Sequence, residues 1–344
     1  MKILVTGGAG FIGSQFVRHW LIRHPQDEVV TLDLLTYAGL RNRLEDVDAN
    51  PRHRFVQGDI CEASTVKQAM EGCEVVAHFA AESHVDRSIT DAAPCIRTNV
   101  EGTRMLLQGA LELGVKRFLH VSTDEVYGPI LEGSHAEDAN LRPRSPYAAS
   151  KAAADLLVQA YRATHGLAAL VVRPTNTFGP WQFPEKFIPL CITQAIQDLP
   201  LPIYGDGLQQ RSWLPVEELC DAIDQVLQAG ELGTIYNISS PWERANREVA
   251  ATILRLLGKP QALIHGVSDR PGHDRRYAMD GTRLEQLGWR ARRPFDDALR
   301  ATVAWYRDHP AWWRPLKDRL HDDPYHWLNR SAGAGAGHAA GVGR

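Results

Sequence analysis

The sequence predicts an α/β fold in which a doubly wound parallel sheet is joined to a smaller C-terminal lobe. Two observations carry this prediction. Short apolar runs alternate with amphipathic helical stretches through the first half of the chain, which indicates parallel strands covered by helices on both faces. The chain also has 344 residues, more than one hydrophobic core usually serves, so we expect two lobes.

The expected elements follow one another at regular spacing. We expect strands at residues 3–5, 29–32, 55–56, 74–79, 117–121 and 168–172, and helices at residues 11–22, 64–70, 99–113 and 147–164. In the first helix Ile12, Phe16 and Trp20 recur every four residues, which places them on one face.

The composition of the sequence changes after Pro174, where prolines and glycines become frequent. Residues 176–330 are therefore expected to form mainly the smaller lobe, with some segments returning to the sheet. This lobe should cover the C-terminal edge of the strands, where open α/β sheets bind ligands. Residues 331–344 are rich in glycine and alanine, bury little, and are expected to be a disordered tail.

Composition excludes several classes of protein. The formal net charge is −3, from 38 Lys and Arg against 41 Asp and Glu, which argues against a nucleic-acid partner. No apolar run approaches the ~18 residues needed to cross a membrane, and the N-terminal apolar run breaks at glycines without a signal-peptide core. The five cysteines form no CxxC pair, so we expect no metal site and a reducing, cytoplasmic setting.

A glycine-rich turn lies between the first expected strand and the first helix. The segment TGGAGFIG at residues 6–13 holds Gly7, Gly10 and Gly13, and Phe11 and Ile12 open the helix. Residues without a Cβ let backbone N–H groups approach a pyrophosphate at the helix N-terminus. Because a strand precedes the turn and a helix follows it, the pattern predicts a Rossmann-type dinucleotide site, and residues 1–175 become the NAD-binding domain that also carries the catalytic residues.

Asp33 comes twenty residues after Gly13, at the end of the second expected strand. A carboxylate there can accept both adenosine ribose hydroxyls and repels a 2′-phosphate, so we expect NAD rather than NADP. The residues after the third and fourth strands are placed for the adenine and the cofactor ribose. They are Asp59, Ile60, Phe79, Ala80 and Ala81.

A YxxxK pattern follows Ser145, which can cap a helix N-terminus, and Pro146, which suits a first turn. Tyr147 and Lys151 then lie on one helix face. An ammonium group near a phenol favours the phenolate, so we expect Lys151 to lower the pKa of Tyr147 from about 10 toward neutrality. Such a tyrosine can remove a proton from an alcohol while NAD takes hydride from the same carbon.

Thr123, Asp124 and Glu125 follow the expected strand at 117–121. Two adjacent acids at the end of a strand are either a solvated turn or an acid/base pair, and spacing alone leaves both interpretations open.

Taken together, these motifs resemble those of the extended short-chain dehydrogenase/reductase family, specifically its dTDP-glucose 4,6-dehydratases. The matching blocks cover residues 1 to about 313. They are TGGAGFIG (6–13), LTYAG (35–39), HFAAESHVDRSI (78–89), STDEVYG (122–128), SPYAASKA (145–152), FGPWQFPEKFIP (178–189), LPIYGDG (201–207) and DRPGHDRRYAMD (269–280). The TDE triplet discriminates best, because the related epimerases and decarboxylases share YxxxK but lack Asp-Glu at that place.

The resemblance implies a reaction that converts a nucleotide hexose to its 4-keto-6-deoxy product. Tyr147 takes the C4 hydroxyl proton while NAD takes the C4 hydride, and Thr123 bonds the C4 oxygen. Glu125 then removes the C5 proton, and a protonated Asp124 donates to the C6 hydroxyl, which leaves as water. Hydride returns to C6 and a proton to C5, so NAD is regenerated.

The resemblance also implies binding residues and an assembly. Cofactor contacts extend to Ser83, Thr98 and Thr177, besides Tyr147 and Lys151. Substrate contacts are Ser83, Thr123, Asn176, Lys186, Phe187, Pro202, Tyr204, Arg211, Asn246, Arg270 and His273. Arginines among them suit a diphosphate, because a guanidinium binds oxygens bidentately. A homodimer is expected, with helices near 100–113 and 147–164 forming a four-helix interface.

The sequence departs from the family pattern at positions expected near the substrate or the nicotinamide, namely Leu40, Thr177, Phe178, Phe187, Ser212, Pro215, Ser239 and Ser240. None of them removes an acid, a base or the Tyr/Lys pair, so we hypothesise a working dehydratase with altered nucleotide or sugar tolerance. The alternatives are a 4-epimerase or decarboxylase of the same family, a dehydratase for another nucleotide sugar, and a non-catalytic NAD-binding regulator.

Overall fold

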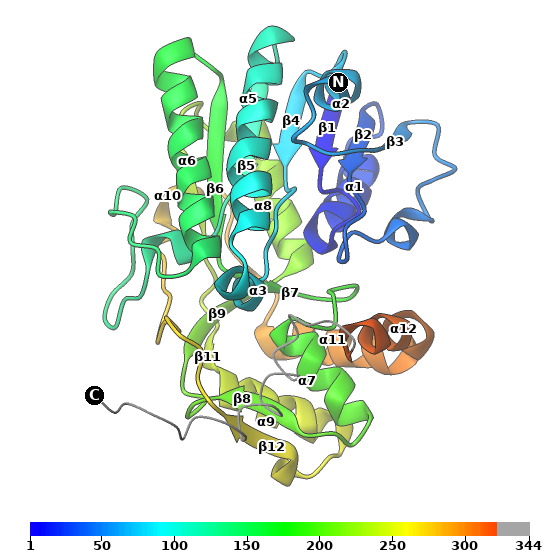
Figure 1. Cartoon of the computed structure of the whole chain (residues 1–344), viewed down its shortest axis with the longest axis vertical. Helices are drawn as coiled ribbons and strands as arrows, with labels where there is room; N and C mark the ends of the chain where they lie inside the picture. The colour runs from blue at the N-terminus through cyan, green and yellow to red at the C-terminus, as the bar shows by residue number, and fades with distance from the viewer. Residues whose placement is uncertain (322–344) are drawn as a thin grey trace, which may run out of the picture.

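The centre of the molecule is a seven-stranded, fully parallel sheet with the order β10-β6-β5-β4-β1-β2-β3 (Figure 1). The computed structural model describes residues 1–321, so the expected tail at 331–344 lies outside the described residues. The strands are β1 (Lys2–Thr6), β2 (Glu28–Asp33), β3 (His53–Gln57), β4 (Val75–His78), β5 (Arg117–Val121), β6 (Ala169–Pro174) and β10 (Ile235–Ile238). The predicted doubly wound α/β fold class is confirmed.

Helices cover both faces of the sheet, as its uninterrupted apolar strands require. On one face lie α1 (Phe11–Arg23) and α8 (Val216–Ala229), whose apolar residues, among them Phe16 and Trp20, join one buried cluster. The other face carries α2 (Ala63–Met70), α5 (Thr103–Glu112) and α6 (Pro146–His165). Ahead of α5 run α3 (Val85–Thr90), α4 (Ala93–Cys95) and the π-helical turn η2 (Ile96–Gly102); η2 forms the first residues of the helix expected at 99–113.

The smaller lobe lies beyond the carboxyl ends of the strands (Figure 1). It contains α7 (Phe187–Ile196), α9 (Asn246–Leu257), α11 (Phe295–Asp308) and α12 (Pro310–His321), which share a separate apolar core. Its strands form a small sheet of β7 (Asn176–Phe178), β9 (Gln210–Pro215) and β11 (Glu243–Ala245), and a pair of β8 (Leu201–Tyr204) and β12 (Ile264–Val267). Segments from this half of the chain return to the large sheet, among them α8, β10 and α10 (Thr282–Gln286), while the boundary near residue 175 stays a prediction.

Local sequence determines how α6 begins. The Ser145 hydroxyl accepts a hydrogen bond of 3.1 Å from the Ala148 N–H, and Pro146 occupies the first helical turn. The predicted N-cap is therefore confirmed, and it fixes where Tyr147 and Lys151 stand relative to the sheet.

A buried ion pair holds α6 against β6. Arg173 donates from Nε to Asp155 Oδ2 at 2.9 Å, and both side chains are almost fully buried. Arg173 also donates from Nη1 to the Tyr127 hydroxyl at 2.7 Å, and that hydroxyl donates to Asn237 Oδ1 at 2.7 Å. The chain of bonds ties α6 and β6 to β10 beneath the carboxyl ends of the strands.

Among residues 1–321, no helix is long and apolar enough to cross a bilayer. Over the same residues, no group of three or more His, Cys, Asp or Glu side chains is arranged to hold a metal ion.

We expect R173M to lower the free energy of unfolding by about 3–5 kcal/mol, because it leaves the Asp155 carboxylate buried without its partner. Guanidinium denaturation at pH 7 measures the change. K116M is the control: it breaks the exposed Lys116–Glu74 pair and should cost less than about 1 kcal/mol. A loss for R173M no larger than that of the control would contradict the expectation.

Candidate active site

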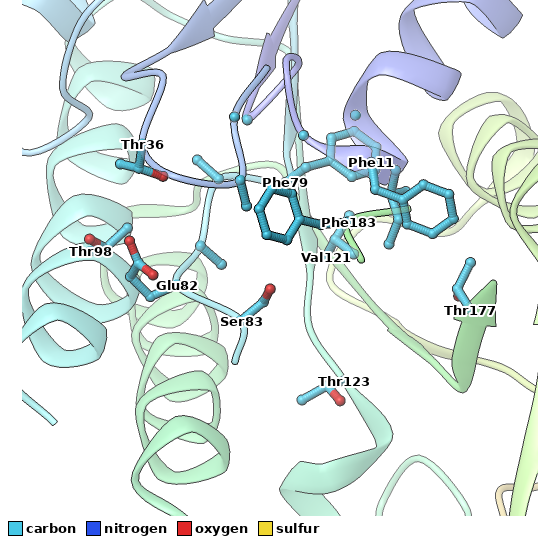
Figure 2. Close-up of a pocket in the computed structure, with 18 of the residues that line it drawn as sticks. Phe11, Thr36, Phe79, Glu82, Ser83, Thr98, Val121, Thr123, Thr177 and Phe183 are labelled. Carbon is cyan, nitrogen blue, oxygen red and sulfur yellow. The ribbon is translucent and has the colours of Figure 1, made fainter. Parts of the chain in front are cut away.

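A pocket of about 330 Å³ opens at the carboxyl ends of β1, β2, β4, β5 and β6. The strand order reverses between β1 and β4, and open α/β sheets bind ligands at such a point. Figure 2 shows Ser83, Thr123 and Thr177 placed around one open space, each coming from a different segment. Every predicted cofactor residue lines this pocket: Gly7, Gly10, Phe11, Ile12, Gly13, Asp33, Asp59, Ile60, Phe79, Ala80, Ala81, Ser83, Thr98, Tyr147, Lys151 and Thr177.

The glycine turn brings β1 and α1 unusually close together. A Cβ on Gly13 would lie 2.2 Å from the Gly7 carbonyl oxygen, so a side chain there would displace backbone. Gly7 has a φ of 70°, a left-handed conformation that favours glycine. The turn thus leaves the N-terminus of α1 facing the pocket without side chains in the way, which fits a dinucleotide pyrophosphate.

Asp33 joins the glycine turn to the loop after β2. Its Oδ2 accepts the Ala9 N–H at 2.9 Å, and its Oδ1 accepts the Leu35 N–H at 2.8 Å. Burial raises the pKa of Asp33, and the two backbone N–H groups oppose that rise. Each carboxylate oxygen keeps a second acceptor position, so the predicted contact with ribose hydroxyls remains sterically open.

Tyr147 and Lys151 stand on one face of α6, as expected, but their electrostatics differ from the prediction. Lys151 donates from Nζ to the Val121 carbonyl at 2.7 Å, and burial lowers its pKa to about 8. Burial first, and the Glu125 carboxyl second, raise the pKa of Tyr147. The predicted lowering of the Tyr147 pKa by Lys151 is therefore wrong, because desolvation of the phenolate outweighs any help from the ammonium group.

Asp124 and Glu125 are not a solvated turn. They begin the short helix η3 (Asp124–Tyr127), where the Thr123 hydroxyl accepts the Glu125 N–H at 3.3 Å and donates to Asp124 Oδ1 at 3.2 Å. Asp124 is only 4% exposed. Burial, with the neighbouring Glu125 charge, raises the pKa of Asp124 to about 7. The acid/base interpretation of the pair is the one that this burial favours.

Three cations act on the Glu125 carboxyl, one of which, Arg211, also acts on Asp124. Burial raises the pKa of Glu125, but Arg270, Arg211 and Lys186 oppose the rise. Lys186 donates from Nζ to the Ser83 carbonyl at 2.7 Å, across the mouth of the pocket. Burial thus raises the pKa of both adjacent carboxyls; the Glu125 charge adds to the rise at Asp124, whereas cations oppose the rise at Glu125.

Only part of the predicted substrate set lines the pocket, namely Ser83, Thr123, Asn176 and Lys186. The others lie outside its lining: Phe187, Pro202, Tyr204, Arg211, Asn246, Arg270 and His273. Three of them gather at one place, because Tyr204 and Arg270 both donate to the Asp86 carboxylate at 2.9 Å, and the His273 ring packs edge-on against Tyr204. This cluster borders the pocket through the electrostatic contact of Arg270 with Glu125.

Pro202 and Asn246 are further away in the smaller lobe, in β8 and at the start of α9, and Phe187 stacks on Trp213. Nothing in the described residues brings these three to the pocket lining. Their predicted contacts with substrate stay predictions.

Sequence reasoning missed several buried charges that shape the site. Glu185 accepts from the Tyr37 hydroxyl at 2.7 Å and from Arg87 at 3.2 Å, which anchors the segment carrying Lys186. Asp274 accepts from the Tyr277 hydroxyl at 2.6 Å beside Arg211. Glu185 and Asp274 both fall inside sequence blocks that match the family. Glu185 directly precedes Lys186, a predicted substrate contact, and an acid beside a predicted cation was the signal that could have identified it.

A family model described as GDP-mannose 4,6 dehydratase matches residues 4–302. The chain belongs to this dehydratase family. It is 51% identical over 306 residues to the low-salt glycan biosynthesis protein Agl12 of Haloferax volcanii, covering 89% of this chain and 98% of that one. It is 48% identical over 319 residues to a dTDP-glucose 4,6-dehydratase of an Actinoplanes strain, covering 91% of this chain and 100% of that one.

Among solved structures, the dehydratase DesIV of Streptomyces venezuelae, with NAD and dTDP bound, matches with a TM-score of 0.90 at 50% identity. The match covers 92% of this chain and 100% of that one. These findings confirm the predicted family and the predicted enzyme class, a hydro-lyase of the nucleotide-sugar 4,6-dehydratase type. The predicted cofactor, NAD, is the one bound in that structure.

The raised pKa of Asp124 makes the stability of this dehydratase depend on pH. The folded chain holds the Asp124 proton up to about pH 7, against an ordinary pKa near 3.8, so stability from this group is complete below about pH 4 and is lost as the pH rises through 7. We expect D124N to raise the free energy of unfolding at pH 8 by about 2–4 kcal/mol more than at pH 4.

Denaturant titrations at the two pH values measure this difference. D138N, on an exposed aspartate, is the matched control and should change stability by less than about 0.5 kcal/mol at either pH. If D124N shifted stability equally at both pH values, the raised pKa would be refuted.

Proposed function

We propose that this chain converts dTDP-glucose to the 4-keto-6-deoxy sugar nucleotide and water, with NAD regenerated in each turnover. One observation carries the proposal: a buried, proton-holding Asp124 stands beside a cation-facing Glu125 in the same pocket as Tyr147, Lys151 and the glycine turn. An epimerase or a decarboxylase of this family has no need of such a pair. The substrate is inferred from relatives that carry the name dTDP-glucose 4,6-dehydratase.

Two features of the pocket suit NAD. A Cβ at Gly13 would clash with the backbone, and the N-terminus of α1 faces the open space. The glycine turn would hold the pyrophosphate, Asp33 the adenosine ribose, and Tyr147 with Lys151 the second ribose. When bound, NAD supplies an acceptor for the C4 hydride and the donor of the hydride that returns to C6.

Tyr147 acts first, as the base that removes the C4 hydroxyl proton. Its raised pKa means that the phenolate needs positive charge close by when it forms. Lys151 supplies such a charge from one turn along α6, and Thr123 bonds the same C4 oxygen. The C4 ketone that results acidifies the proton on C5.

Water then leaves across C5 and C6. Glu125 accepts the C5 proton; the cations around it oppose the rise of its pKa and so help to keep it deprotonated before this step, while burial preserves its basicity. Asp124 gives its proton to the C6 hydroxyl as the C6–O bond breaks, and its pKa near 7 keeps that proton available at neutral pH. Asp124 ends as the carboxylate, Glu125 ends protonated, and the C5 proton is available to return when hydride reaches C6.

Lys186, Arg211 and Arg270 are proposed to hold the diphosphate of the nucleotide sugar. Arg211 is 5% exposed and lies 4.3 Å above the Tyr277 ring, and Arg270 is held by Asp86. Both guanidinium groups act on Glu125 electrostatically. A nucleotide sugar whose diphosphate binds them would therefore place its sugar near Glu125, the proposed base.

We further propose that the chain works as a homodimer in the cytoplasm. Ile96 on η2 is 50% exposed and Leu156 on α6 is 57% exposed, and these two elements pack against each other at the outer face of the sheet (Figure 1). Two apolar side chains left open on neighbouring helices suit a two-fold helical interface. All five cysteines are free thiols, which suits a reducing compartment.

For the assembly, light scattering should give twice the mass of one chain, and L156D should give the mass of one chain, because a buried aspartate at a two-fold axis places like charges together. L131D, on a loop residue that is 72% exposed, is the control and should remain dimeric. A single-chain mass for the wild type would overturn the proposed dimer.

For the reaction, we expect E125Q to stop exchange of the C5 proton with solvent deuterium while C4 oxidation continues. Bound NADH should then accumulate, with absorbance near 340 nm, and dehydration should fall by at least about 100-fold. E132Q, on an exposed loop glutamate, should behave as the wild type. Unchanged exchange in E125Q would show that Glu125 is not the base.

Mass spectrometry of products from a panel of nucleotide sugars tests the function itself. Loss of one water from dTDP-glucose supports the proposal, while a product of unchanged mass indicates an epimerase and loss of carbon dioxide from a uronic acid sugar indicates a decarboxylase. A strong preference for dTDP-glucose over every other sugar would overturn the hypothesis of altered tolerance. NAD binding without any turnover would favour the regulatory alternative.

A further inference from the structure

Arg43 is a fully buried cation in the wall of the dinucleotide pocket, and the proposed reaction gives it no role. It belongs to the short helix η1 (Arg41–Leu44), which follows the loop after β2. Its relative exposure is 0%, and it lines the same pocket as the glycine turn and Asp33. An arginine is rarely buried so deeply without a specific reason.

The guanidinium of Arg43 joins three segments that are distant in sequence. Nη1 donates to the carbonyl of Ala9 in the glycine turn at 2.9 Å and to the carbonyl of Ala38 at 2.6 Å. Nε donates to the carbonyl of Trp181, in the loop after β7, at 3.0 Å. The N–H of the same Ala9 donates to the Asp33 carboxylate. Two buried side chains, Arg43 and Asp33, therefore hold the Ala9 carbonyl and the Ala9 N–H.

Arg43 keeps its charge without a counter-ion among residues 1–321. No ion pair within that part of the chain includes Arg43, although Asp33 acts on it electrostatically. Burial lowers the pKa of Arg43 to about 10, which still leaves a cation at neutral pH. Nη2 has no hydrogen-bond partner in the described residues. A desolvated positive charge in a pocket wall attracts an anionic ligand more strongly than a solvated one does.

The same side chain reaches the C-terminal helices through tryptophans. Trp181 has a φ of 68°, a strained left-handed conformation, and its ring packs 4.8 Å from Trp305 on α11 and 5.2 Å from Trp312 on α12. The guanidinium lies 5.5 Å from the Trp312 ring centre. Arg43 therefore connects the glycine turn to the part of the smaller lobe that packs against it.

We propose that Arg43 is a positioning residue for the dinucleotide: by holding the carbonyls of Ala9, Ala38 and Trp181, it sets the shape of the glycine turn and slows cofactor loss. This inference rests on the proposed function, in which the dinucleotide takes hydride from C4 and gives it back at C6. If the cofactor dissociated between these two steps, the oxidised sugar could not be reduced at C6. Slow release of the dinucleotide therefore favours completion of the reaction.

Two substitutions of Arg43 separate the effect of its hydrogen-bonding geometry from the effect of its positive charge. R43K keeps the charge but loses the planar fork that reaches three carbonyls, whereas R43M loses both. On protein stripped of nucleotide, we expect the Kd for NAD, read from quenching of tryptophan fluorescence, to rise about tenfold in R43K and about 100-fold in R43M. R41M, on the same short helix but with its side chain paired to Asp48, is the control and should bind NAD within about twofold of the wild type.

The NAD content of the purified proteins gives a readout that does not depend on turnover, and it should fall in the order wild type, R43K, R43M. At saturating NAD, the KM for the nucleotide sugar should stay within about threefold, since Arg43 touches no predicted substrate residue. A role in general stability alone would lower the Tm of folded R43K without changing its Kd for NAD, and that result would overturn the proposal.

If R43M does not fold, W312L takes its place, because it removes the ring beside the guanidinium without touching the pocket lining. We expect it to raise the Kd for NAD by about threefold. Wild-type NAD affinity in both R43K and the second variant overturns the inference about Arg43, whereas a wild-type chain that binds no NAD overturns the proposed function instead.

Discussion

The hydrogen bond from the Ala9 N–H to the buried Asp33 carboxylate is the contact on which the site is built. It joins the turn after β1 to the end of β2, at the edge where the strand order reverses. The 2.2 Å approach between a hypothetical Cβ at Gly13 and the Gly7 carbonyl means that only glycines allow the turn to close this tightly. Once the turn is closed, the N-terminus of α1 and the acids after β5 face one space, so cofactor and substrate chemistry share a single pocket.

The strands, helix caps and turns that depend on local sequence patterns could be predicted from the sequence. The strand expected at residues 117–121 is β5 (Arg117–Val121), because its short length and its place between two helical stretches favour a strand. The Ser145 cap and the glycine turn were predictable for the same reason. That some later segments return to the large sheet was expected, but which ones, α8 and β10 among them, was not, because pairing between distant segments depends on tertiary packing that leaves no periodic signal.

Electrostatics were harder to predict than positions, and Tyr147 shows why. Its spacing to Lys151 is a matter of helix geometry, which the YxxxK pattern specifies. Its pKa depends on burial and on Glu125, a residue whose distance from Tyr147 is fixed only by the fold. The same limit applies to the substrate set: Arg211 and Arg270 act on Glu125 although neither lines the pocket, and Asp86, which holds Arg270, carried no signal of its own.

The arrangement of charges explains how a site so unfavourable to ionised groups stays folded. Asp124, Lys151 and Arg43 are all desolvated at one edge of the sheet, and each has a pKa displaced toward its neutral form. Beneath them the buried Asp155–Arg173 ion pair ties α6 to β6, and Arg173 also donates to the Tyr127 hydroxyl. This ion pair holds α6 in place beneath the pocket. Above it, burial raises the pKa of both Asp124 and Glu125; the Glu125 charge adds to the rise at Asp124, whereas Arg270, Arg211 and Lys186 oppose the rise at Glu125.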